Sequence, residues 1–437
     1  MQLPEFYYQK QRIKKILIIG LGVSGRSVVE FLRPYQIDIA GFDQNQSIPG
    51  IKCYQSWQKI DLDDYDLLVA APGIPINKAP FNKLYRYWGK VIGDIELFAE
   101  IIAREHNASI VAVTGSNGKT TVASFLHYVL NQAGIKAALV GNIGTPVFQM
   151  ISDQIEIYVL EISSFQIDLL KSARFSIGCV LNISEDHLDR YPDFSAYRDA
   201  KLSLLAHSHC ALMNHQDCLK NNIALPASSV YFFNNTKNYI DNNTVIFNNK
   251  ALLRESELKL KGRHNLENIL AVVCLLEVLG LDYQSFLPYF RQFEGLQHRC
   301  QKLQKINGTQ FINDSKATNI GAVIAAIQSI AAGKNIVLLF GGLTKGACFD
   351  KLLPILERHV SFVCIYGQDC YIIEQAIKYT TKYIVTDNLT TAFNQALQIA
   401  KAGDIVLLSP GCSSFDEFSG YQARGEHFMQ LVQNLKG

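Results

Sequence analysis

The sequence predicts an α/β protein built from three successive domains. Short apolar runs rich in Val and Ile alternate with amphipathic stretches along the whole 437-residue chain, which is the pattern of parallel sheets covered by helices. Glycine-containing turns join a strand to a helix in the first two blocks. The length also suits roughly three domains of ordinary size. We place the domains at residues 1–95, 96–296 and 297–437.

The composition indicates a globular protein. Hydrophobic residues make up 48% of the chain and charged residues 18%, with a formal net charge of +2. So small a charge gives no electrostatic basis for a nucleic-acid partner. We expect no membrane insertion, since no apolar run approaches the ~18 residues of a membrane span. A polar N-terminus and ten cysteines without a CxxC pair favour a cytoplasmic location.

The first domain opens with a strand, a glycine-rich turn and a helix. Its expected strands lie at residues 14–20, 37–43 and 66–74. The turn GLGVSG contains Gly20, Gly22 and Gly25, and Asp43 ends the next strand. This is the dinucleotide-binding fingerprint of a Rossmann-like domain, in which a helix N-terminus receives a diphosphate. NAD would fit, which makes a nicotinamide-dependent oxidoreductase one alternative, and a UDP diphosphate would satisfy the same geometry.

The central domain carries a sharper motif. TGSNGKTT, at residues 114–121, lies between an expected strand at 109–115 and a helix with one apolar stripe. Such a loop exposes backbone N–H groups to phosphate oxygens, and Lys119 can reach the β- and γ-phosphates. Thr120 or Thr121 can supply a hydroxyl to Mg²⁺. Val113 stands where a strict Walker A loop has its first glycine, so we predict a P-loop-type ATPase domain with a variant loop.

Acidic and imidazole groups follow the next expected strands. Glu161 closes one strand, and Asp186 and His187 come just after another. Because the carboxyl ends of parallel strands converge on a ligand crevice, Glu161 and His187 are candidate Mg²⁺ ligands. Beyond them, residues 230–260 are expected to form short hairpins, and residues 262–280 a long helix.

The segment HSHCALMNHQDC contains side chains that could in principle form a second metal site. Its possible zinc ligands are His207, His209, Cys210, His215 and Cys218. Their spacing matches no standard zinc module. The apolar residues between them favour a strand entering a core, with ordinary side chains in the adjoining loop.

The motifs TGSNGKTT, LEISSFQ, NISEDHLDRYP, YRDAK, GRHNLENILAV and QHRCQ, in this order, resemble the Mur ligase family. The resemblance covers essentially the whole chain. It implies ATP and Mg²⁺ as cofactors, and a Rossmann-like third domain. The residues implied to bind ATP are Gly115, Ser116, Asn117, Gly118, Lys119, Thr120, Thr121, Asn265, Asn268, Arg299 and Asp314.

The same resemblance implies the metal ligands Thr120, Glu161, His187 and Lys201. From the residues alone, Lys201 would be a solvated lysine. In the family, the lysine at this place is carbamylated by CO₂ and so resembles a carboxylate near Mg²⁺.

The third domain indicates which substrate is added. Its NDSKATN motif, residues 313–319, resembles that of the family members that add D-glutamate. Lys316, Thr318, Lys345, Ser414 and Tyr421 are implied to surround the amino acid, whose carboxylates need cations and hydroxyl donors. The UDP-N-acetylmuramoyl-L-alanine substrate is implied to contact Gly20, Gly22, Ser24, Asp43, Gly73, Asn142 and Ser163. Leu343 and Tyr421 stand where many members have Asp and Phe.

The resemblance therefore implies a monomeric, ADP-forming amide ligase of peptidoglycan precursor synthesis. Its substrate carboxylate would attack the γ-phosphate, and the amine would then attack the acyl phosphate. The catalytic residues implied are Lys119, His187, Lys201 and Lys316. His187 and Lys316 are both candidates for the base that deprotonates the amine. The alternatives are a ligase for another amino acid or for folate, and a non-catalytic nucleotide-binding regulator.

Overall fold

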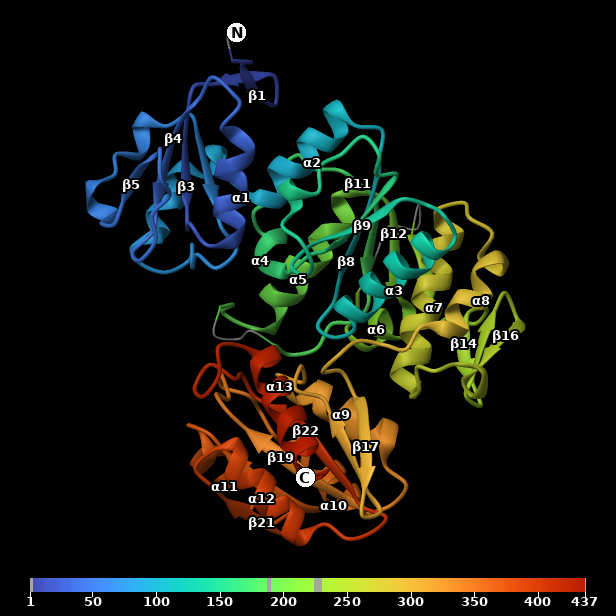
Figure 1. Cartoon of the computed structure of the whole chain (residues 1–437). Coiled ribbons are helices and arrows are strands. Elements are labelled where there is room, and N and C mark those ends of the chain that lie inside the picture. Colours follow the sequence, from blue (N-terminus) through green and yellow to red (C-terminus); the bar gives the residue numbers. More distant parts are fainter. Residues whose placement is uncertain (1–2, 187–189, 224–229, 437) are drawn as a thin grey trace.

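The computed structural model describes residues 3–186, 190–223 and 230–436. These residues form three α/β domains in series, and each domain is built on one mainly parallel sheet (Figure 1). The predicted α/β architecture, with Rossmann-like outer domains around a P-loop-type central domain, is confirmed. Within the same ranges, no helix is both long enough and apolar enough to span a bilayer.

The first domain has a five-stranded parallel sheet in the order β5-β4-β3-β6-β7. Its elements are β1 (Phe6–Tyr8), β2 (Gln11–Ile13), β3 (Lys15–Ile19), α1 (Val23–Leu32), β4 (Asp38–Phe42), β5 (Lys52–Tyr54), β6 (Leu67–Ala70) and β7 (Val91–Gly93). The order reverses between β3 and β6, as in a Rossmann fold, and ligands bind at such a switch point. α1 lies on the side of this sheet that faces the central domain (Figure 1).

The glycine-rich turn after β3 is shaped by its backbone contacts. Gly20 has a φ of +93°, which disfavours other residues. A Cβ on Gly25 would lie 1.9 Å from the carbonyl oxygen of Gly20, so α1 packs directly on the end of β3. Gly22 has open space around its Cα. Two of the three glycines therefore serve packing, and the third leaves room for a ligand.

The central domain has a six-stranded parallel sheet in the order β13-β12-β11-β8-β10-β9. Its elements are α2 (Asp94–Glu105), β8 (Ser109–Thr114), α3 (Lys119–Gln132), β9 (Ala137–Gly141), β10 (Ile157–Glu161), α4 (Ser164–Ile167), β11 (Phe175–Val180), α5 (Phe194–Ala206), β12 (Ser208–Asn214), α6 (His215–Lys220), β13 (Val230–Phe233), α7 (Arg263–Val278) and α8 (Leu287–Gln292). β8, which leads into the phosphate loop, lies in the middle of the sheet between β11 and β10.

The Asn-rich segment corrects one prediction. Residues 239–254 form the expected antiparallel strands β14 (Tyr239–Asp241), β15 (Thr244–Phe247) and β16 (Lys250–Arg254). The expectation of hairpins was wrong for β13, which pairs in parallel with β12. Its Phe233 is buried in the central core, so burial of this side chain favours the sheet edge over a local hairpin. The segment weighed for zinc forms β12 and α6, with Leu212 and Met213 buried.

The third domain has a six-stranded sheet in the order β17-β18-β22-β19-β20-β21, antiparallel only between β17 and β18. Its elements are β17 (Gln301–Ile306), β18 (Thr309–Asn313), α9 (Ile320–Ile330), β19 (Ile336–Gly341), α10 (Leu353–His359), β20 (Val360–Tyr366), α11 (Cys370–Ile377), β21 (Tyr383–Val385), α12 (Leu389–Ile399), β22 (Ile405–Gly411) and α13 (Tyr421–Gln433). Short 3₁₀ segments lie at Trp57–Lys59, Leu62–Asp64, Phe81–Lys90, Val147–Gln149, Glu255–Glu257, Tyr283–Phe286 and Asn434–Lys436.

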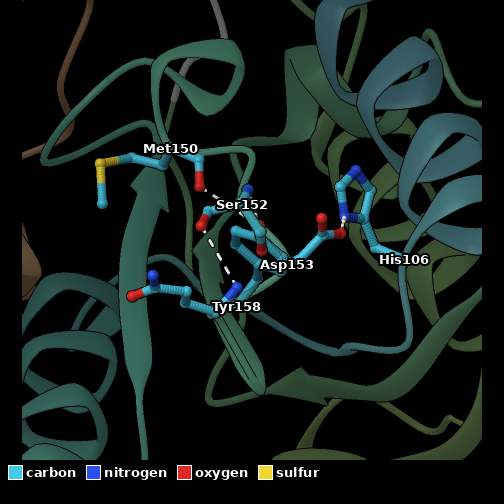
Figure 2. Close-up of polar contacts among 6 residues, drawn as sticks. His106, Met150, Ser152, Asp153 and Tyr158 are labelled. Carbon is cyan, nitrogen blue, oxygen red and sulfur yellow. Dashed lines mark hydrogen bonds and ion pairs between the residues drawn. The ribbon is translucent and has the colours of Figure 1, made fainter.

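A polar network fixes the loop before β10 (Figure 2). The hydroxyl of Tyr158 accepts from the backbone N–H of Ser152 at 3.1 Å and donates to the carbonyl of Met150 at 3.2 Å. Asp153 lies 2.8 Å from Nδ1 of His106, just after α2. Tyr158 is near the start of β10, whereas Glu161 ends it. This network therefore anchors the edge of the sheet opposite the one where the predicted site residues lie.

Candidate functional site

A cavity of about 770 Å³ is lined by residues of all three domains. Many predicted site residues line it: Gly73, Ser116, Asn117, Gly118, Lys119, Thr120, Thr121, Asn142, Glu161, Ser163, Lys201, Asn265, Asn268, Arg299, Asp314, Lys316, Thr318, Lys345, Ser414 and Tyr421. Gly20, Gly22, Ser24, Asp43 and Gly115 are not among the lining residues. His187 lies outside the described residues.

Hydrogen bonds from the segment after β11 hold the phosphate loop in place. The backbone N–H of Asn117 donates to Oδ1 of Asn182 at 2.8 Å, and Nδ2 of Asn182 donates back to the carbonyl of Asn117 at 3.0 Å. Gly118, with a φ of +83°, starts α3, and a Cβ there would lie 2.6 Å from Oδ1 of Asn268. The loop therefore packs between the segment that follows β11 and helix α7. Asn182, the first residue of the NISEDHLDRYP motif, thus has a supporting role that the sequence analysis did not assign to it.

Two lysines meet at one backbone carbonyl of this loop. Nζ of Lys119 donates to the carbonyls of Gly115 at 2.6 Å and Ser116 at 3.0 Å, and Nζ of Lys201 donates to Gly115 at 3.1 Å. Lys201 is only 2% exposed, so its reading as a solvated lysine was wrong: α5 turns it inward. Burial, followed by repulsion from Lys119, lowers the pKa of Lys201 well below 10.5. Burial also lowers the pKa of Lys119.

A carboxylate faces these lysines. Oε1 of Glu161 accepts from Nδ2 of Asn142 at 2.9 Å, whereas Oε2 is buried without a hydrogen bond among the described residues. A buried, unpartnered carboxylate oxygen is costly unless a cation joins it. The hydroxyl of Thr120 lines the same cavity. These hard oxygen donors fit Mg²⁺.

The next part of the cavity is lined by amides from α7 and by two charged residues after it. Nδ2 of Asn268 donates to Oδ1 of Asn265 at 3.3 Å, and both residues are buried. The carboxylate of Asp314 accepts from the N–H of Cys300 at 3.0 Å and from the hydroxyl of Ser409 at 2.8 Å. Burial raises the pKa of Asp314 to about 6. Burial also lowers the pKa of Arg299, so an anion beside this guanidinium would be stabilised.

The third domain adds a cationic pocket. Nζ of Lys316 lies 4.2 Å from the ring centre of Tyr421, a cation–π arrangement. Burial, followed by repulsion from Arg299, lowers the pKa of Lys316 to about 8. Lys345 has a left-handed backbone, and Ser414 is buried beside the same cavity. Cations and hydroxyls here would suit a ligand with carboxylate groups.

Arg424 of α13 is a supporting residue that the sequence did not reveal. It is fully buried, and its guanidinium donates to the carbonyl of Ser315 at 2.8 Å and to the carbonyl of Cys412 at 3.1 Å. Ser315 precedes Lys316, and Cys412 precedes the loop with Ser414. Arg424 therefore joins the two segments that form the pocket. Its signal was weak, because an arginine near the end of a motif is usually a surface residue.

The predicted contacts of the first domain lie at its switch point instead of in the cavity. The carboxylate of Asp43 accepts from the backbone N–H groups of Leu21, Asn45 and Gln46 at 2.9–3.0 Å. It thereby supports the glycine-rich turn. The side chain of Ser24 hydrogen-bonds to Asp94, a buried residue at the start of α2. Gly73, which follows β6, is the predicted first-domain residue that does line the cavity.

Comparison with known families covers most of the chain. Residues 14–93 match the Mur ligase MurD-like N-terminal domain, residues 113–276 the Mur ligase middle domain, and residues 298–412 the Mur ligase glutamate ligase domain. Each match falls within one of the three domains expected from the sequence.

Individual relatives agree with these matches. The chain is 43% identical over 432 residues to the UDP-N-acetylmuramoylalanine--D-glutamate ligase of Francisella tularensis subsp. novicida (strain U112), covering 99% of both chains. It is 42% identical to the enzyme of the same name from Francisella tularensis subsp. tularensis (strain WY96-3418), again covering 99% of both.

Solved structures share the fold at low identity. The UDP-N-acetylmuramate-alanine ligase MurC of Thermotoga maritima superposes with a TM-score of 0.62 at 17% identity, covering 97% of this chain and 99% of that one. The MurF ligase of Thermotoga maritima, solved in complex with ADP, gives a TM-score of 0.58 at 16% identity, covering 99% and 97%. Together with the domain matches and the identity over nearly the full length, this shows that the chain belongs to the Mur ligase family.

Proposed function

We propose that the protein joins D-glutamate to UDP-N-acetylmuramoyl-L-alanine with ATP, releasing ADP and phosphate. The observation that carries the proposal is one cavity that combines a lysine-bearing phosphate loop with the cationic pocket of Lys316 and Lys345. Relatives of the corresponding name at 42–43% identity support the choice of substrates. Its place would be peptidoglycan precursor synthesis, on which cell shape and division depend.

The first chemical step would activate the sugar-linked carboxylate. One of its oxygens attacks the γ-phosphorus of ATP, the bond to the β-phosphate oxygen breaks, and an acyl phosphate and ADP result. Lys119 leaves the carbonyls of Gly115 and Ser116 and donates to the phosphates instead, which neutralises charge as it develops. Catalysis here consists of positioning and electrostatics, for which a rigid loop supported by Asn182 is suited.

The metal would be held by Glu161, Thr120 and Lys201, together with the predicted ligand His187. When bound, Mg²⁺ neutralises phosphate charge. The buried amine of Lys201 has a strongly lowered pKa, which favours the neutral nucleophile needed to add CO₂. That addition forms an N–C bond and releases a proton from the nitrogen, and it converts the neutral amine of Lys201 to a carbamate whose carboxylate could bind the metal.

In the second step the amine of D-glutamate attacks the acyl carbon and phosphate leaves. We assign the base to Lys316, whose pKa of about 8 leaves part of it neutral near physiological pH. Lys345, Thr318 and Ser414 would hold the carboxylates of the amino acid. The surrounding domains exclude water, which would otherwise hydrolyse the acyl phosphate.

We further propose domains at residues 1–95, 96–296 and 297–437, and a monomer acting in the cytoplasm. Support for a monomer comes from the cavity, which takes residues from each domain of a single chain. The first-domain residues Gly20, Gly22, Ser24 and Asp43 would receive the UDP group at the switch point.

The direct test is ADP release with UDP-N-acetylmuramoyl-L-alanine and a panel of D-glutamate, L-glutamate, L-alanine and a diamino acid. Of these amino acids, only D-glutamate is expected to support ADP release. Lys119→Ala should lower that rate by about a thousandfold or more, because a phosphate-neutralising cation is lost, while binding of the UDP-sugar by calorimetry survives. Lys136→Ala, at an exposed position after α3, serves as the control. Normal turnover in Lys119→Ala would refute the phosphate-loop assignment.

A further inference from the structure

Asn319 reaches from the third domain into the central one. Its Oδ1 accepts from the backbone N–H of Ala322 at 2.9 Å and so caps α9. Its Nδ2 donates to Oδ1 of Asn117 at 3.3 Å and to Oδ2 of Asp186 at 3.2 Å. Asn117 belongs to the phosphate loop, and Asp186 follows β11. One carboxamide therefore uses its acceptor in its own domain and both of its N–H groups in the neighbouring domain.

Other polar links between these two domains are weak. Among the residues that the structure describes, the two side-chain hydrogen bonds joining residues 96–296 to 297–437 are both donated by Asn319. The ion pair between Lys351 and Glu185 spans 3.6 Å, with side chains 76% and 49% exposed. Ion pairs this exposed contribute little. Asn319 is half-buried, so its hydrogen bonds are better shielded from water than this ion pair.

The first turn of α9 also lies against the phosphate loop. A Cβ on Gly321 would lie 3.3 Å from Nδ2 of Asn117 and 3.8 Å from Oγ of Ser184. The absence of a side chain at residue 321 therefore lets the helix backbone approach the loop closely. The N-cap residue Asn319 and the first-turn residue Gly321 of α9 therefore both contact Asn117, the first by a hydrogen bond and the second by close packing.

Building on the proposed function, we propose that Asn319 is a positioning residue that holds the third domain closed on the phosphate loop. Lys316 and Thr318 precede it on the same short segment. The link from Asn319 to Asn117 therefore fixes how far these two side chains stand from the triphosphate. Alignment of the reacting groups depends on such placement, and small misplacements are costly. Among the residues that the structure describes, neither Lys316 nor Thr318 makes a side-chain hydrogen bond to the loop that could replace the link.

The variant Asn319→Asp isolates this role. It retains the oxygen that caps α9, loses both N–H donors and places a carboxylate opposite Asp186. Asn388→Asp is the matched control, because Asn388 caps α12, a helix of the same 11-residue length, through a 2.9 Å bond from the N–H of Thr391 within one domain. Asn319→Ala, which removes the cap as well, measures the contribution of capping.

The expected result separates positioning from folding. Asn319→Asp should lower kcat by about tenfold or more and raise KM for the amino acid, because the lost hydrogen bonds and the new repulsion disfavour closure. Its Tm should match that of Asn388→Asp, which keeps the wild-type kcat. Equal kcat values for the two Asp variants would overturn the proposal.

Small-angle scattering with a nonhydrolysable ATP analogue and Mg²⁺ provides an independent readout. Wild-type protein and Asn388→Asp should share one radius of gyration, and Asn319→Asp should show a larger one. An unchanged radius in Asn319→Asp would contradict a closing role even if kcat fell. Because scattering needs no amino-acid substrate, it tests the closing role of Asn319 independently of the proposed ligation of D-glutamate.

Discussion

Four cationic side chains, Lys119, Lys201, Arg299 and Lys316, converge on one cavity, and burial lowers the pKa of each. Glu161 and Asp186 act against that shift for Lys119. Burying so much positive charge costs stability unless anions join it. The triphosphate and the carboxylates of the amino acid would supply those anions. These residues therefore favour ligand binding, and they lower the stability of the ligand-free protein.

The pKa of Lys316 gives a pH prediction. A neutral amine accepts the proton, and its fraction rises as pH passes upward through about 8. We therefore expect kcat/KM for the amino acid, which reports groups of the free enzyme, to rise between about pH 7 and 9 and then level off. Lys316→Arg, which keeps the positive charge throughout this range, should lose activity and this rising limb. A limb centred near pH 6.5 in the wild-type protein would favour a histidine base instead.

Individual residues show where sequence reasoning reached its limit. The loop from Gly115 to Thr121 could be assigned because strand, glycine turn and lysine are neighbours in sequence. Lys201 looked like a surface residue, since nothing local indicates that α5 turns it toward the loop 86 residues earlier. The bond between Asn319 and Asn117 spans 202 residues. Such contacts arise from tertiary packing within and between domains, which local sequence patterns do not encode.

At the scale of elements, glycines set how closely helices approach their neighbours. Gly425 lies inside α13, where alanine would ordinarily be favoured by about 1 kcal/mol. A Cβ there would lie 2.3 Å from Nδ1 of His298, which is buried and hydrogen-bonded to Asn313 at 3.0 Å. Packing at this position therefore outweighs helix propensity.

We expect Gly425→Ala to destabilise the protein by about 1–3 kcal/mol, the usual cost of overpacking a core. Urea unfolding of the third domain would measure the change. Gln430→Ala is the control, because Gln430 is an exposed residue of the same helix. An unfolding midpoint for Gly425→Ala at or above that of the control would show that His298 moves aside without cost.

The pattern of strands was largely predictable, and their pairing was less so. The apolar runs of β3 and β8 are predictable because buried parallel strands have near-continuous hydrophobic sequences. The pairing of β13 was missed, since four residues followed by asparagines do not reveal whether they join a hairpin or a distant sheet.

At the scale of the whole molecule, the first and central domains share one hydrophobic core, whereas the third domain has cores of its own. One apolar cluster joins the first and central domains, with Val28 and Phe98 packed in the same group as Phe175. The two clusters of the third domain contain only residues from 300 onward. The third domain is therefore expected to move and unfold as a separate unit.

Calorimetry tests this expectation. Without ligands, we expect two thermal transitions, one for the joined first and central domains and one for the third domain, because their cores are separate. A nonhydrolysable ATP analogue with Mg²⁺ should bring the transitions together, since ligand binding stabilises both sides of the cavity by about 2.7 kcal/mol at a hundredfold excess over Kd. A single transition in the unliganded protein would contradict the separation.

The resting contacts of Lys119 have a consequence for inhibitors. Its ammonium is already hydrogen-bonded to two carbonyls of its own loop, so any phosphate mimic gains only the difference between the old partners and the new. A compound that fills the space around Asn268 and Tyr421 and leaves this lysine undisturbed avoids that exchange. Neutral groups shaped for those walls are therefore a useful addition to anionic nucleotide analogues in drug discovery.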